Sequence, residues 1–212
     1  MTDTIPRAAV VGGSVIAFAG DLPESHREDI YLSTLYAQRA TRDAYNHGLS
    51  GDWFSYYRNT LRYIGWDVPV PESLSSMSGN TVATQVSESI SRRLGEPFSS
   101  SMTAALAALE RDRAAIELFE NSSLSSRGGF FQMIPCVLKG QNRVEMGIYH
   151  RQFQLYRKMP GFLFVNPERL LHSSTEQMSL ITFNTLYYAQ FREKVKKAVL
   201  SQSMNYLRSL DI

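Results

Sequence analysis

The sequence predicts an α+β fold with about four helices, then a roughly four-stranded antiparallel sheet, then a long C-terminal helix packed on that sheet. The main observation is that the spacing of apolar residues changes at the serine-rich run 121–126. Before this run apolar side chains recur every three or four residues, and after it they alternate or form short continuous runs. Since no linker-like stretch divides the 212 residues, a single domain is expected, with a helical half at 21–120 and the sheet and closing helix at 129–212.

The predicted helices have clear start and stop signals. Asp21 and Glu24, three residues apart, form a capping box in which each side chain satisfies a backbone N–H group at the helix start. Gly48 and Gly65 supply the flexible residue that commonly ends a helix. The four helices are predicted over 21–48, 50–65, 80–94 and 101–119.

The run from Ala8 to Ala19 is almost entirely apolar and precedes the first predicted helix. A secretory signal peptide has a similar short apolar core followed by small residues. Gly12 and Gly13 interrupt this run and Asp3 weakens the positive charge ahead of it, so a buried strand is predicted instead. No stretch approaches the roughly 18 to 20 apolar residues that are needed to span a bilayer.

Four strands are predicted in the second half of the chain. The segment 130–138 is apolar on both alternating faces, as in a central strand that is covered on both sides. The next strand alternates, but its apolar positions change parity past His150, which predicts a bulge or bend there. The strands are predicted over 130–138, 144–157, 161–165 and 177–183, and the closing helix over 185–210.

Charge and cysteine content narrow the class of protein. The 22 basic and 20 acidic residues give a net charge of +2, which is too small to predict a nucleic-acid partner. The single cysteine, Cys136, excludes an intrachain disulfide and fits a reducing compartment. The predicted location is therefore the cytoplasm, with secretion without a cleaved signal peptide as the alternative.

The titratable residues form no recognisable catalytic or metal-binding motif. The four histidines lack the three- or four-residue spacing from another ligand that would place both on one helix face. Gly12-Gly13-Ser14 is a candidate phosphate cradle, but the lysine of such loops is missing, so a small-residue bend is predicted. Neither a metal nor a catalytic set is predicted, and the balance is against an enzyme. The best remaining base is His150, with Glu145 or Asp29.

Cys136 lies in the middle of a predicted strand, with Phe130, Ile134 and Leu138 on the same face. A lone cysteine in apolar surroundings is most often an inert core residue with a raised thiol pKa. The alternative is that these neighbours line an apolar slot for a fatty acyl chain, bound to the sulfur as a thioester. That acyl group would be the one cofactor predicted, and it would bring the protein to a membrane.

The second predicted helix and the residues after it are rich in aromatic side chains, namely Trp53, Phe54, Tyr56, Tyr57 and Trp66. Aromatic residues at helical spacing usually face a core. Here they surround the helix nearly completely, so an interaction surface or self-association seam is the alternative. The eleven tyrosines of the chain are too many to bury together, which also favours a partner surface.

These observations lead to three hypotheses about function. The first is a non-catalytic protein-interaction or self-assembly protein that acts through its aromatic-rich surface. The alternative is a secreted or host-directed virulence-type effector that contacts membranes, with an acyl chain on or near Cys136 as one means of doing so. The third is an enzyme with an unrecognised pocket. A protein partner or a second copy is the predicted partner, a membrane surface comes second, and nucleic acid is not expected.

Overall fold

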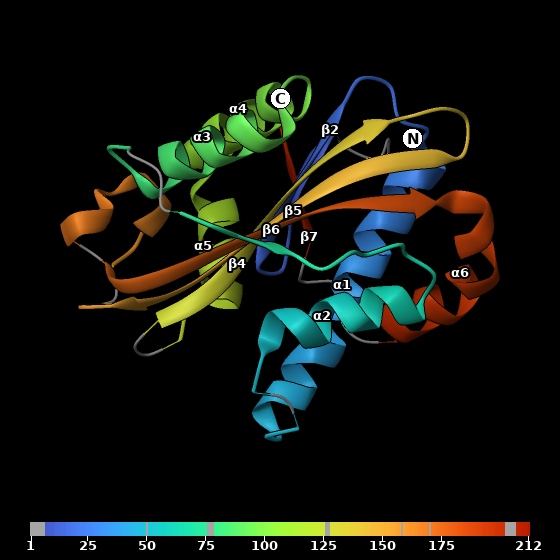
Figure 1. Ribbon diagram of the computed structural model, residues 1–212, viewed down its shortest axis with the longest axis horizontal. Helices are drawn as coiled ribbons and strands as arrows, with labels where there is room; N and C mark the ends of the chain where they lie inside the picture. The colour runs from blue at the N-terminus through green and yellow to red at the C-terminus, as the bar shows by residue number, and fades with distance from the viewer. Residues whose placement is uncertain are drawn as a thin grey trace.

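The computed structural model describes residues 7–49, 51–75, 79–125, 128–157, 159–169, 171–201 and 207–212. Within these ranges the chain forms one mixed seven-stranded sheet with helices on both faces (Figure 1). The strands are β1 (Ala8–Val11), β2 (Ser14–Ala19), β3 (Glu72–Leu74), β4 (Gly128–Leu138), β5 (Arg143–Leu155), β6 (Leu171–Asn184) and β7 (Leu207–Leu210). The helices are α1 (Glu24–Asn46), α2 (Trp53–Tyr63), α3 (Val82–Leu94), α4 (Phe98–Arg111), α5 (Arg113–Ser123) and α6 (Thr185–Leu200), with 3-10 turns at Phe162–Phe164 and Pro167–Arg169.

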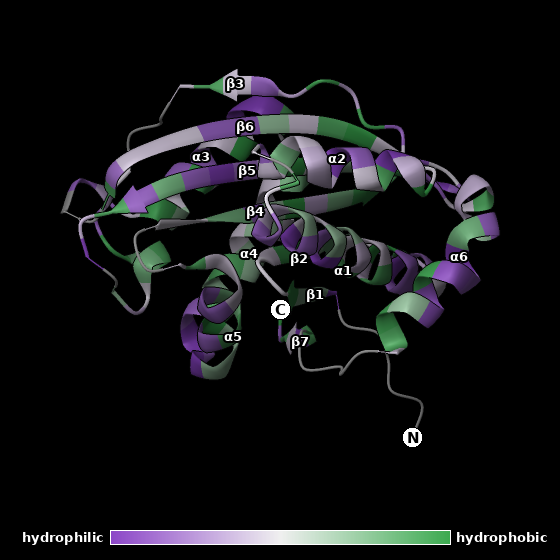
Figure 2. Ribbon diagram, turned by 90° about the horizontal axis from the view of Figure 1, so that it is seen from below, coloured by the Kyte–Doolittle hydropathy of each residue, from purple (hydrophilic) through white to green (hydrophobic). Residues whose placement is uncertain are grey.

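The strands lie in the order β3-β6-β5-β4-β2-β1-β7, which Figure 2 shows from top to bottom. The predicted four-stranded antiparallel sheet is therefore wrong in both strand number and direction. The apolar run at 8–19 forms the buried hairpin β1–β2, and β2 pairs in parallel with β4. Two parallel neighbours need a long connection, and the helices α1 to α5 provide it.

Two separate hydrophobic cores lie on the opposite faces of the sheet. Along β2, Val15 and Ala17 belong to the core under α3, α4 and α5, whereas Ile16 and Phe18 belong to the core under α1, α2 and α6. Successive residues of a strand face opposite sides, so this alternation separates the two layers. Figure 1 shows α3 and α4 on one side of the strands and α1, α2 and α6 on the other.

The two helical layers explain the change of parity along β5. Val144, Met146 and Ile148 face the α1–α2–α6 core, and Phe153 and Leu155 face the α3–α4–α5 core. The strand keeps its register with β6 through position 150, and its irregularity lies between residues 154 and 155. The irregularity that was predicted past position 150 is therefore present, four residues further along the strand. It is not the cause of the parity change, because a strand covered on different faces at its two ends changes parity without a bulge.

Other boundaries differ from prediction for local reasons. The fourth predicted helix is divided at Asp112, whose side chain caps α5 by accepting a hydrogen bond from the backbone N–H of Ala115 at 3.1 Å. The predicted strand at 161–165 is a 3-10 turn that follows Gly161 in the left-handed region. The closing helix ends at Leu200 instead of 210, and residues 207–210 form β7 against β1. Residues 202–206 of that prediction lie outside the described ranges.

The first helix starts without the predicted capping box. It begins at Glu24 after Pro23, and no described side chain accepts a hydrogen bond from its first turn. Asp21 instead forms an ion pair with Arg7, with 2.6 Å between Oδ1 and Nη2. The N-terminal end of a 23-residue helix is therefore left without a side-chain cap.

The second helix was predicted more closely. Asp52 caps it by accepting a hydrogen bond from the backbone N–H of Ser55 at 3.0 Å.

Among the described residues, no helix of the protein combines the length and the apolar character that crossing a bilayer requires.

Candidate functional site

The aromatic residues predicted as an interaction surface lie mostly in the core. Trp53, Phe54, Tyr57 and Trp66 are buried between α1, α2, α6 and the sheet, and Tyr56 is half-buried. In this conformation these five side chains present little surface to a partner. Tyr56 keeps more surface open than the other four, and the use of these residues as an interaction surface stays a prediction.

His150 is enclosed by this aromatic core. Its ring stacks on Phe54 with 4.3 Å between ring centroids and an angle of 2°, and on Trp53 at 5.7 Å and 4°. Its Nδ1 lies 3.0 Å from Nε2 of Gln132, which can donate a hydrogen bond to it. Burial lowers the pKa of His150 from 6.5 to about 3, so the imidazole is neutral at physiological pH.

The structure does not assemble the catalytic set suggested for the enzyme hypothesis. Glu145 lies an odd number of residues from His150 on β5 and therefore on the opposite face of the sheet. Its carboxylate lies 3.7 Å from Lys139. Asp29 is held by Arg192 of α6 through two hydrogen bonds of 2.8 and 2.6 Å. In the described part of the chain, no group of three or more His, Cys, Asp or Glu residues has the geometry to hold a metal ion.

The segment Gly12-Gly13-Ser14 forms the turn between β1 and β2, as the small-residue interpretation predicted. The side-chain amide of Gln38 occupies it. Gln38 accepts a hydrogen bond from the backbone N–H of Gly13 at 3.2 Å and donates to Ser14 Oγ at 2.6 Å. Gly12 has a φ of +55°, in the left-handed region, and a Cβ there would also meet the side chain of Gln38, so the turn favours glycine. The donor that a phosphate would use at Gly13 is already satisfied.

Cys136 is fully buried on β4, in the core under α1, α2 and α6. Ile134 is buried in the same core, and Phe130 and Leu138 pack against it partly buried, so the predicted neighbours do share its face. The thiol donates to the carbonyl of Ile134 at 3.5 Å, and burial raises its pKa well above the usual value. Whether the sulfur carries an acyl chain stays a prediction.

Exposed aromatic residues gather instead where the end of α2 meets α6. This surface, here called the α2/α6 corner, consists of Tyr63, Leu186, Tyr187, Phe191 and Lys194. Tyr63 is 64% exposed, Leu186 68% and Tyr187 55%. None of these residues was predicted as a surface, although Tyr187 lies beside the helical stripe of Tyr188, Val195 and Val199 that faces the core. Leu186, two residues before Tyr188, lies on the opposite side of α6 from this stripe.

The corner is held together by specific contacts. Lys194 Nζ lies 4.8 Å from the centroid of the Tyr63 ring and 3.2 Å from its hydroxyl oxygen. The rings of Tyr187 and Phe191 meet edge to face at 6.0 Å. Gly65 follows α2 and lies so close to α6 that a Cβ there would be 2.9 Å from both of these rings. The exposed side chains therefore belong to a packed surface.

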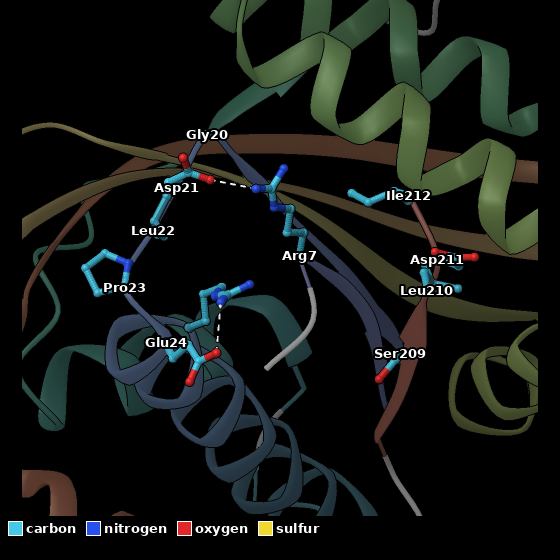
Figure 3. Close-up of a pocket in the computed structure, with 11 residues that line it drawn as sticks. Arg7, Gly20, Asp21, Leu22, Pro23, Glu24, Ser209, Leu210, Asp211 and Ile212 are labelled. Atoms are coloured by element: carbon cyan, nitrogen blue, oxygen red, sulfur yellow. Dashed lines mark hydrogen bonds and ion pairs between the residues drawn. The ribbon is translucent and has the colours of Figure 1, made fainter. Parts of the chain in front are cut away.

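A pocket of about 760 Å³ opens at the start of α1 (Figure 3). Its walls come from four places: Arg7 before β1, Asp21 after β2, Glu24 and Arg27 on α1, and residues 209–212 at the end of β7. In Figure 3 the ion pair of Arg7 and Asp21 spans one side of the pocket, and Asp211 lies across from it. No sequence motif pointed to this pocket, because its walls come from both ends of the chain.

Comparisons with known proteins show no family. No protein-family model matches the chain, and no curated protein matches it. The solved structures that resemble it distantly include the following three. Activated Cyt2Ba monomer from Bacillus thuringiensis subsp. israelensis has a TM-score of 0.35 at 14% identity, covering 57% of this chain and 72% of its own. A delta-endotoxin scores 0.41 at 11% identity, covering 83% of this chain and 84% of its own. The Evf virulence factor scores 0.41 at 10% identity, covering 99% of this chain and 93% of its own. At these scores the likeness supports no statement about function.

Proposed function

We propose that the protein is a non-enzymatic effector that contacts membrane surfaces through the α2/α6 corner. The observation that carries this proposal is the exposure of three large side chains, Tyr63, Leu186 and Tyr187. The ring of Tyr63 lies against the ammonium group of Lys194. Large apolar side chains clustered on a soluble protein usually mark a binding surface. Tyrosine is favoured at the boundary between water and lipid, because its ring is apolar and its hydroxyl is polar.

The charges on α6 favour an anionic membrane. Four of its residues are cationic, but Arg192 and Lys196 form ion pairs with Asp29 and Glu28 of α1. Lys194 and Lys197 are exposed on the same helix as the aromatic residues. A lysine close to an anionic lipid surface contributes about 1 kcal/mol of attraction, and an apolar contact with the lipid adds to it.

Flotation with vesicles tests the proposal. The wild type should float with vesicles of phosphatidylcholine and phosphatidylserine and less with phosphatidylcholine alone. The triple variant Tyr63→Ser, Leu186→Ser, Tyr187→Ser should stay at the bottom of the gradient. Tyr156→Ser is the matched control, because Tyr156 is 65% exposed just after the end of β5 and lies outside the corner. A wild type that never floats, or a triple variant that floats like the control, would refute the proposal.

The contact does not require an acyl chain, since the thiol of Cys136 faces the core and not the corner. The intact mass of the floating protein should equal that of the bare sequence, before and after treatment with hydroxylamine. An added mass that hydroxylamine removes would transfer the membrane contact to an acyl group on Cys136.

Self-association is the competing use of the same surface, since tyrosine-rich patches are common at protein interfaces. Light scattering distinguishes the two. A monomer that floats supports membrane contact. A concentration-dependent dimer that the triple variant abolishes, without flotation of the wild type, would replace the membrane by a second copy.

A further inference from the structure

We propose that the pocket at the start of α1 binds the oxyanion group of a ligand, a phosphate or a carboxylate, held by Arg27 and by the first turn of the helix. This site is distinct from the α2/α6 corner and does not rest on the membrane contact. Two independent observations point to it. One is a buried guanidinium group whose ion pair with Glu24 is longer than a hydrogen bond, and the other is a helix end without a side-chain cap.

Arg27 lines the pocket and is only 8% exposed. A guanidinium group has five N–H donors, and burying it without acceptors is costly. Its Nε has no hydrogen-bond partner among the residues that the structure describes. Its ion pair with Glu24 joins Nη2 and Oε1 at 3.8 Å, which is beyond hydrogen-bond distance. Because Nε is fully buried, an oxyanion in the pocket would bind the Nη groups, and it would give Nη2 a closer acceptor than Glu24 provides.

The start of α1 adds a second attraction for an anion. The first backbone hydrogen bonds of the helix are donated by His26 and Arg27 to the carbonyl of Pro23. The N–H groups of Glu24 and Ser25 precede these bonds, and no side chain of the described ranges caps them. The dipole of a 23-residue helix places partial positive charge at this end. Helix starts with free N–H groups bind phosphate and carboxylate for this reason.

The carboxylates of Asp21, Glu24 and Asp211 line the pocket and lower its affinity for an anion. Asp21 is paired with Arg7 at 2.6 Å, so its charge is largely neutralised. Glu24 competes most directly with a bound oxyanion for Arg27, because its carboxylate is paired with Arg27 and lies at the same helix end. Its side chain is 55% exposed and can turn toward solvent when a ligand enters. Binding should therefore strengthen when this carboxylate is removed.

Titration calorimetry with inorganic phosphate, in chloride buffer of constant ionic strength, tests the site. The wild type should bind phosphate saturably. Glu24→Gln should bind roughly tenfold more tightly, and Arg27→Gln at least about tenfold more weakly. Arg93→Gln is the matched control, because Arg93 forms an ion pair with Glu72 at 2.9 Å away from the pocket. Acetate in place of phosphate shows whether a carboxylate suffices.

Absence of saturable binding in the wild type would overturn the proposal, as would equal affinities of wild type and Arg27→Gln. Arg27→Lys keeps the charge but loses the planar fork of donors. It should bind phosphate more weakly than the wild type, and equal binding would also count against the site. This variant and Glu24→Gln carry the test if Arg27→Gln does not fold, as judged by near-ultraviolet circular dichroism.

The oxyanion belongs either to a soluble molecule or to a lipid headgroup, and flotation separates these sources. If Arg27→Gln floats like the wild type, the ligand is soluble. If it loses both phosphate binding and flotation, the headgroup is the source. Failure of the two proposals is distinguishable, because the triple corner variant should bind phosphate normally whether or not the wild type floats.

Discussion

The two ends of helix α2 carry similar residues and have opposite surroundings. At its start, Trp53 and Phe54 are buried and stack on His150. At its end, Tyr63 is 64% exposed and lies against Lys194 of α6. The difference comes from what the fold places opposite each end, which is the sheet at one end and a single helix at the other. Aromatic content alone therefore indicates neither a core nor a binding surface.

The largest expected difference between the two ends is in stability. Phe54→Ala removes a fully buried ring from between α2 and His150, and it should lower the free energy of unfolding by about 3 to 5 kcal/mol. Tyr63→Ala removes an exposed ring and should change it by at most about 0.5 kcal/mol. Urea unfolding followed by circular dichroism measures both. Equal effects would show that the first end of α2 is not the core element described.

The buried end should also be sensitive to acid. The pKa of His150 is lowered to about 3, mainly by burial, and in the unfolded chain it returns to its usual value of about 6.5. The unfolded chain thus binds the extra proton, so the stability that neutral His150 supports is complete above pH 6.5 and is lost as the pH falls toward 3. At pH 4.5 the loss should be about 2 to 3 kcal/mol.

Urea unfolding at pH 7.5 and pH 4.5 measures this loss when wild type and His150→Asn are compared, because other groups titrate equally in both. The wild type should lose more stability than the variant by the stated amount. His47→Asn, at an exposed position after α1, is the control and should follow the wild type. Parallel behaviour of His150→Asn and wild type would contradict the burial of a neutral imidazole.

Breaking the ion pairs that attach α6 to α1 should lower the free energy of unfolding by an intermediate amount. Asp29 has a side chain 3% exposed, and its partner Arg192 is 38% exposed. Arg192→Gln leaves a buried carboxylate with fewer donors and should cost about 1 to 2 kcal/mol. Lys196→Gln breaks the neighbouring pair with Glu28, in which both side chains are 41% exposed, and should cost less than about 0.5 kcal/mol. Equal costs would mean that burial of Asp29 does not matter for holding the corner in place.

A small effect is expected from the two tyrosines of the corner. Tyr63→Ser combined with Tyr187→Ser should shift the free energy of unfolding by less than about 1 kcal/mol, because both side chains are mostly exposed. A large loss would mean that these rings stabilise the fold and were not retained for binding. The same urea series provides this number.

The sequence predicted local features better than long-range ones. Asp52 was predicted near the start of the second helix, and Cys136 was placed with its correct neighbours on one strand face, because caps and strand alternation depend on nearby residues. The parallel pairing of β2 with β4 joins Ser14 to Gln132, and no local pattern reports a partner so distant along the chain. For the same reason, the closing segment at 207–210 was predicted as helix although it pairs with β1.

The candidate sites were missed for a related reason. The aromatic residues that were predicted as a surface are those most densely clustered along the sequence, and most of them form the core. The pocket of Arg7 and Arg27 is completed by residues 209–212, which reach it only through the pairing of β7 with β1. The corner joins α2 to α6 across more than a hundred residues, through Tyr63 and Lys194. Surfaces of this kind follow from topology, which the apolar pattern described only in part.

The most direct test of membrane contact at the corner is a polarity-sensitive fluorophore on a single introduced cysteine. In a Cys136→Ala background, Tyr187→Cys labels the corner and Tyr156→Cys labels an exposed site outside it. Addition of anionic vesicles should shift the emission of the label at 187 to shorter wavelength and leave that at 156 unchanged. No shift at 187 under conditions where the protein floats, or equal shifts at both positions, would contradict the account.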